Sequence, residues 1–89
     1  MRAVHIRVTG RVQGVFFRAN TKKRALELNL RGWVKNTPDG AVEATFEGEE
    51  GRLQEILSWC RTGPPGAQVE KMEYGEVPYT GGYSDFAIR

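Results

Sequence analysis

Residues 4–28 read VHIRVTGRVQGVFFRANTKKRALEL, and the spacing of their apolar residues changes partway along. The first positions alternate apolar with polar residues, which predicts a strand whose apolar face is formed by Val4, Ile6 and Val8. From about Phe17 the spacing becomes that of one helical stripe: Phe17, Thr21, Ala25 and Leu28. Residues 10–15 are therefore expected to form a loop between a strand and a helix.

Two more strands are predicted on the C-terminal side of this unit, at about 33–36 and 42–47. They flank residues 37–40 (TPDG), a turn in which proline presets φ and glycine closes the bend. The second of these strands alternates strictly, which predicts one face on the core and one in water. The expected core face is Val42, Ala44 and Phe46, and the expected water face is Glu43, Thr45 and Glu47.

Helical spacing returns at about 49–61 and ends at residues 63–66 (GPPG). A fourth strand is expected near 69–77, and a short terminal strand at 84–88. The order predicts an α/β (α+β) fold, a ferredoxin-like βαββαβ sandwich with a mostly antiparallel sheet and both helices on one face. A chain of 89 residues is enough for one domain, so a single domain spanning 1–89 is expected.

The composition, 39% hydrophobic and 27% charged, is that of an ordinary soluble globular protein. The single cysteine, Cys60, lies on the apolar stripe of the second helix, so we expect a buried structural thiol and a reducing compartment. Residues 1–10 contain no continuous apolar run, which predicts neither a signal peptide nor a membrane span. A cytoplasmic protein that contacts no membrane is therefore expected.

Charge is distributed unevenly along the chain. Through Asn36 there are nine basic residues and one acidic residue, whereas the remainder has four basic and ten acidic residues. A positive N-terminal half attracts anions, which could be small phosphates or nucleic acid.

The loop at residues 10–18 (GRVQGVFFR) has the chemistry of an anion site. A loop that enters a helix presents unpaired backbone N–H groups beside the positive end of the helix dipole. Gly14 allows the positive φ or the close backbone approach that such a loop needs. Arg18, in the first helical turn, can fold back and bind a phosphate through two hydrogen bonds, although a solvated surface arginine is the alternative.

Asn36 is expected at the same edge of the sheet as this loop. A helical crossover makes the first two strands parallel, so their C-terminal ends lie together. An amide there could hold a water for attack on phosphorus, because it donates and accepts hydrogen bonds without a charge that repels anions. The alternative role for Asn36 is in the turn that precedes Pro38.

Together these residues resemble the acylphosphatase family. The similarity lies in residues 10–18 (GRVQGVFFR) and 30–36 (LRGWVKN), continues at Asp39-Gly40, and covers nearly the whole chain. It implies the ferredoxin-like fold and hydrolysis of acyl phosphates without metal or cofactor, with inorganic phosphate as product or inhibitor. It also implies that Arg18 and Asn36 are catalytic, with phosphate bound at Gly14, Val15, Phe16, Phe17 and Arg18.

The sequence has no obvious acid–base pair, and hydrolysis of an acyl phosphate does not require one. The carboxylate leaving group is a weak base and needs no strong general acid. No residue predicts a pocket for the acyl group, so broad specificity is expected. Small-molecule acyl phosphates are the expected partners, and a monomer is the expected state.

Two other functions fit the same fold. One is a non-catalytic accessory domain, because related modules occur inside larger proteins. The other is an RNA-binding module, which would stack bases on aromatic residues of the central strands. The polar faces of the first and third strands instead carry His5, Arg7, Glu43, Thr45 and Glu47. The two glutamates would repel a nucleic-acid backbone, so no nucleic-acid partner is expected.

Overall fold

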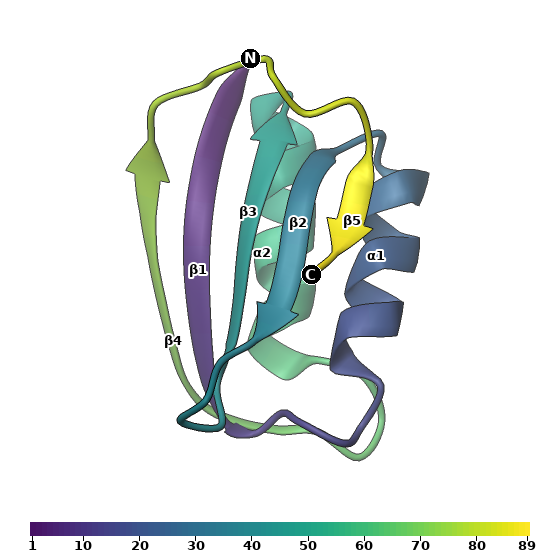
Figure 1. Cartoon of the computed structure of the whole chain (residues 1–89), viewed down its shortest axis with the longest axis vertical. Coiled ribbons are helices and arrows are strands. Elements are labelled where there is room, and N and C mark those ends of the chain that lie inside the picture. The colour runs from purple at the N-terminus through teal and green to yellow at the C-terminus, as the bar shows by residue number, and fades with distance from the viewer.

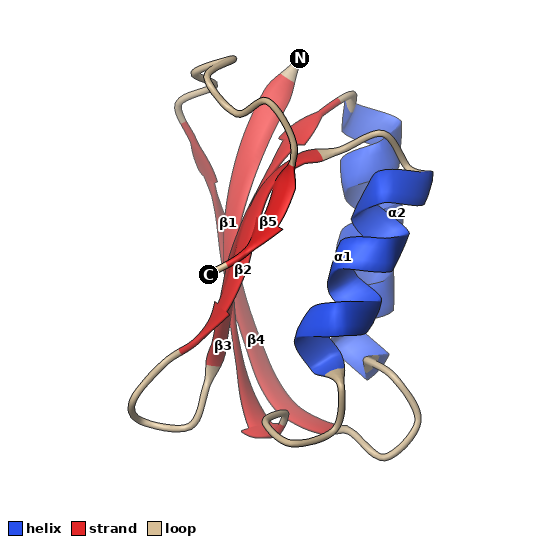
Figure 2. Ribbon diagram, turned by 45° about the vertical axis from the view of Figure 1, so that its right-hand side comes forward, coloured by secondary structure: helices blue, strands red, loops and turns tan.

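The computed structural model describes residues 1–89 and contains one five-stranded sheet with both helices packed on the same face (Figures 1 and 2). In chain order the elements are β1 (Arg2–Arg11), α1 (Phe17–Glu27), β2 (Arg31–Asn36), β3 (Val42–Gly48), α2 (Glu50–Thr62), β4 (Gln68–Val77) and β5 (Phe86–Ile88). This arrangement confirms the predicted ferredoxin-like sandwich. None of the helices is both long and apolar enough to cross a bilayer.

The sheet has the strand order β4-β1-β3-β2-β5, and only the β2–β5 pair is parallel. Strands β1 and β2 are both antiparallel to β3, so they run in the same direction. Their C-terminal ends therefore meet at one edge of the sheet, at the bottom of Figure 1. The loop into α1 starts at this edge, as the crossover topology predicts.

The core lies between the sheet and the two helices. Phe46 stacks on Phe86 with ring centroids 5.4 Å apart, and Phe17 tilts against Trp59 at 5.5 Å. Cys60 is fully buried in this core, and burial raises the pKa of its thiol to about 12. The burial confirms the prediction of a buried thiol, and a thiol that stays protonated is a poor nucleophile.

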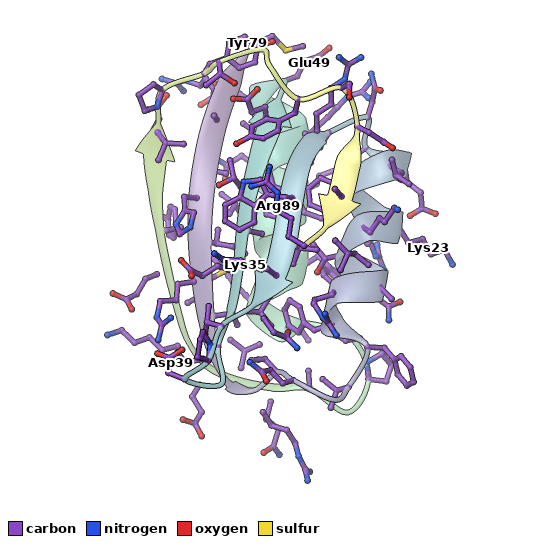
Figure 3. The ribbon with its side chains drawn as sticks, in the orientation of Figure 1. Lys23, Lys35, Asp39, Glu49, Tyr79 and Arg89 are labelled. Carbon is purple, nitrogen blue, oxygen red and sulfur yellow. The ribbon has the colours of Figure 1, made fainter.

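The face of the sheet opposite the helices is not entirely open to water. Thr45 is 8% exposed and Glu47 is 4% exposed, so the expectation that both face water was wrong. The segment between β4 and β5 crosses the top of this face, where Figure 3 labels Tyr79. Glu47 accepts hydrogen bonds from the amides of Thr80 (2.9 Å) and Gly81 (3.1 Å), which compensate the carboxylate for its lost water.

Gly10 is required where β1 packs against β4. Its φ is 121°, and the register with β4 shifts between Thr9 and Gly10. A Cβ at this position would lie 2.2 Å from the carbonyl oxygen of Gln68, a backbone atom with little room to move. Two separate constraints, conformation and space, therefore disfavour any other residue at this position.

We expect Gly10→Ala to lower the free energy of unfolding by about 3 kcal/mol, because strain and a backbone clash add together. Gly51→Ala is the matched control: it lies in α2, where a Cβ would meet nothing within 4 Å. That variant should gain about 0.5 kcal/mol from reduced freedom of the unfolded chain. Urea unfolding measures the change in the free energy of unfolding for each variant. Equal urea midpoints for Gly10→Ala and Gly51→Ala would contradict the packing assigned to Gly10.

Candidate active site

A cavity of about 290 Å³ lies at the edge where β1 and β2 end. Five of the residues that line it were predicted for the site: Gly14, Phe16, Phe17, Arg18 and Asn36. Val12, Ala19 and Ile88 complete the lining. The fold thus brings Asn36 into the same cavity as the loop and Arg18, although the two motifs are separated by the whole of α1.

The loop before α1 has a backbone suited to holding an anion. Gly14 has a φ of 75° and Phe16 a φ of 61°, so two left-handed residues turn the chain within three positions. The amides from Gln13 to Phe16 donate to no other backbone group, and α1 adds the unpaired N–H groups of its first turn. Such a run of donors at a helix start forms a nest for phosphate oxygens.

Gly14 is needed for its backbone conformation. A Cβ there would meet nothing within 4 Å, so protein packing leaves room for one, and the positive φ is the constraint. Val15 was also predicted for the phosphate site, but its side chain packs against the core and does not line the cavity. Any contact that Val15 makes with an anion is therefore through its amide.

Arg18 and Asn36 have the freedom that ligand-binding side chains need. Arg18 is the second residue of α1, is exposed, and takes part in none of the ion pairs of the chain. Asn36 is the last residue of β2 and is half-buried, and its amide takes part in none of the side-chain hydrogen bonds. The cavity therefore contains a guanidinium and a side-chain amide that are not engaged in a side-chain hydrogen bond or an ion pair with another protein group.

Gln13 was not predicted as a site residue, and it ties the loop to the turn after Asn36. Its Nε2 donates to the carbonyl oxygens of Thr37 (2.8 Å) and Ala41 (2.9 Å). Both acceptors belong to the β2–β3 turn, so one side chain connects the loop before α1 to the turn that follows Asn36. No periodicity marks this residue in the sequence, because it lies in a loop and its partners are more than twenty positions away.

The same turn is held from the sheet. Arg7 on β1 forms an ion pair with Asp39, and Thr37 also donates to the Asp39 carboxylate. These two hydrogen bonds, that from Arg7 first, lower the pKa of Asp39 to about 2. Asp39 is therefore ionised at neutral pH, and the turn that follows Asn36 is anchored by Arg7 of β1 as well as by Gln13 of the loop.

From the activity that the resemblance implies, we expect Gln13→Ala to lower kcat for an acyl phosphate about tenfold while weakening inorganic phosphate binding much less. The variant loses the hydrogen bonds to the turn that follows Asn36, whereas the loop amides and Arg18 remain. Steady-state kinetics with phosphate as competitive inhibitor separates the two effects. A loss of phosphate affinity equal to the loss of kcat would show that Gln13 shapes only the loop.

No group of three or more His, Cys, Asp or Glu side chains in the chain is placed to hold a metal ion. His5, which the sequence predicts to be a surface residue, lies on the face away from the helices. Its Nε2 is 3.2 Å from Oε2 of Glu43. It does not line the cavity.

Comparison with known proteins identifies the family. The chain matches the acylphosphatase family over residues 4–88. An acylphosphatase from Rubrobacter xylanophilus is 54% identical over 97% of this chain and 78% of its own length. The crystal structure of acylphosphatase from Bacillus subtilis has a TM-score of 0.95 at 38% identity and covers 100% of this chain and 99% of that one. HypF from T. kodakarensis has a TM-score of 0.86 at 37% identity, with 100% of this chain matching 12% of that chain.

The fold and these relatives define a small hydrolase built on a ferredoxin-like sandwich. The chain belongs to the acylphosphatase family, and it is an enzyme that hydrolyses acyl phosphates.

Proposed function

We propose that Arg18 and Asn36 perform this hydrolysis from the two sides of the cavity. Arg18 binds the phosphoryl group through its planar guanidinium, and the amides from Gly14 to Arg18 surround the phosphoryl oxygens. Asn36 orients the attacking water. One observation carries the proposal: both side chains line one cavity with the loop, and neither is engaged by another protein group.

The reaction is an in-line displacement at phosphorus. The oxygen of water bonds to phosphorus, and the bond from phosphorus to the acyl oxygen breaks, with its electron pair leaving on the carboxylate. The proton lost by the water passes to the phosphate product. Charge that builds on the phosphoryl oxygens is stabilised by Arg18 and by the loop amides, and the backbone conformation of the loop already orients these amides before the reaction begins.

Attack at phosphorus is tested by hydrolysing benzoyl phosphate in oxygen-18 water with EDTA present. We expect the label in inorganic phosphate and none in benzoate, because the bond between phosphorus and the acyl oxygen breaks. Mass spectrometry of both products gives the answer. Label in benzoate would place the attack at the carbonyl carbon, where Arg18 and Asn36 have no assigned role.

The accessory-domain function draws support from HypF, in which a domain of this fold forms a small part of a much longer chain. Against it, the Rubrobacter and Bacillus acylphosphatases align over most or nearly all of their own lengths. We propose that residues 1–89 act as one catalytic domain, as a monomer in the reducing cytoplasm, in line with the buried free thiol of Cys60. Size-exclusion chromatography with light scattering tests the monomer.

One observation favours the RNA-binding function. The face of the sheet away from the helices carries an aromatic side chain, Trp33 of β2, whereas the first and third strands place none there. The ring of Trp33 is contacted by Lys35, 5.4 Å from the centroid, and by Arg89, 5.2 Å away, both labelled on this face in Figure 3. A stacking platform needs an uncovered ring. We therefore propose no nucleic-acid partner, and submicromolar binding of single-stranded RNA at physiological salt would contradict this.

A further inference from the structure

Phe16 is an exposed aromatic residue in a strained conformation beside the proposed phosphate site. Its backbone is left-handed, with φ 61° and ψ 28°, which costs a residue other than glycine about 1–2 kcal/mol. Two hydrogen bonds to its carbonyl oxygen hold this conformation, one from the Asn20 amide (3.1 Å) and one from Asn20 Nδ2 (2.9 Å). The residue is 78% exposed, more than any other large apolar residue of the chain.

The cavity beside Phe16 is larger than a phosphate needs. Even at the volume of one liquid water for each heavy atom, about 30 Å³, the five atoms of phosphate would fill about half of it. Five of its eight lining residues are hydrophobic. Val12 and Phe17 are buried in the core, so the exposed apolar residues of the lining are Phe16, Ala19 and Ile88, and of these Phe16 and Ile88 are the large ones.

In-line displacement distinguishes these two residues. The attacking water and the leaving carboxylate lie on opposite sides of phosphorus. Asn36 ends β2, and Ile88 lies on the adjacent strand β5, paired with Val34. Both therefore belong to the water side of the cavity. We expect the acyl group on the side of the loop, from which Phe16 lines the cavity.

We propose that Phe16 is the acyl-contacting residue, and that its ring makes the enzyme favour acyl phosphates with bulky apolar or aromatic acyl groups over acetyl phosphate. This inference rests on the proposed roles of Arg18 and Asn36, because they set the direction in which the acyl group leaves. It gives the exposed ring a function: the ring loses its contact with water when it packs against the substrate.

The test compares kcat/KM for benzoyl phosphate with kcat/KM for acetyl phosphate in wild type, Phe16→Ala, Phe16→Tyr and Ile88→Ala. Using the ratio for each protein relative to wild type cancels the intrinsic reactivity of the two substrates. Phe16→Ala should lower the ratio about tenfold, since a lost apolar contact of this size has that effect on discrimination. Phe16→Tyr, which keeps the ring, and Ile88→Ala, on the water side, should keep the wild-type ratio.

An equal loss with both substrates in Phe16→Ala would overturn the inference while leaving the proposed function intact. A fall in the ratio for Ile88→Ala as large as that for Phe16→Ala would also overturn it, because the acyl group would then lie toward β5. If wild type hydrolysed neither substrate, the proposed function itself would fail, and the inference with it.

Discussion

Arg18→Ala is expected to lower kcat/KM for benzoyl phosphate by at least about a thousandfold. Arg18 is the one charged residue that lines the cavity, and its guanidinium makes no ion pair within the protein. Phosphoryl transfer depends mainly on positioning and charge stabilisation, so the loss of this group should affect both. A spectrophotometric assay with EDTA present measures the effect directly.

Two further variants make this result specific. Lys23→Ala removes a positive charge from an exposed position of the same helix, labelled in Figure 3, and should change kcat/KM little. Arg18→Lys keeps the charge but loses the planar pair of donors, so it should recover only part of the activity. If Lys23→Ala lost as much activity as Arg18→Ala, the general positive field of α1, and not Arg18, would account for the effect.

Asn36→Ala is expected to lower kcat by about a hundredfold and to leave inorganic phosphate affinity within about twofold of wild type. In the proposed mechanism the side-chain amide positions water and makes no ion pair with phosphate, so its loss should act on the rate. The surrounding turn should survive the change, because the hydrogen bonds that hold it come from Gln13, Thr37 and Arg7.

Asn36→Asp separates positioning from charge. It keeps the size of the side chain but adds a negative charge to the cavity, so it should weaken phosphate binding as well as the rate. Competitive inhibition by phosphate measures the first effect, and kcat the second. A large loss of phosphate affinity in Asn36→Ala would instead make Asn36 a phosphate ligand.

The residues that could be predicted from the sequence are those with a local pattern. The apolar alternation around Ile6 and the helical stripe of Phe17 predicted their elements, because burial of one face follows directly from spacing. The juxtaposition of Arg18 and Asn36 followed from topology, since a helical crossover forces the two strand ends to one edge.

The features that could not be predicted depend on contacts between distant parts of the chain. Glu47 occupies the polar position of an alternating strand, yet the segment at Thr80 and Gly81 covers it and supplies its hydrogen bonds. Gln13 has no local signal, because its partners lie in another turn. The left-handed conformation of Phe16 is likewise unexpected for a bulky residue, since sterics disfavour it.

The most direct test of the central claim is the binding of inorganic phosphate to wild type, Asn36→Ala and Arg18→Ala, measured by isothermal titration calorimetry with EDTA present. The assigned roles predict similar Kd values for wild type and Asn36→Ala, and a Kd at least about tenfold higher for Arg18→Ala. Equal phosphate affinity in wild type and Arg18→Ala would contradict the account, because the phosphoryl group would then be held without Arg18.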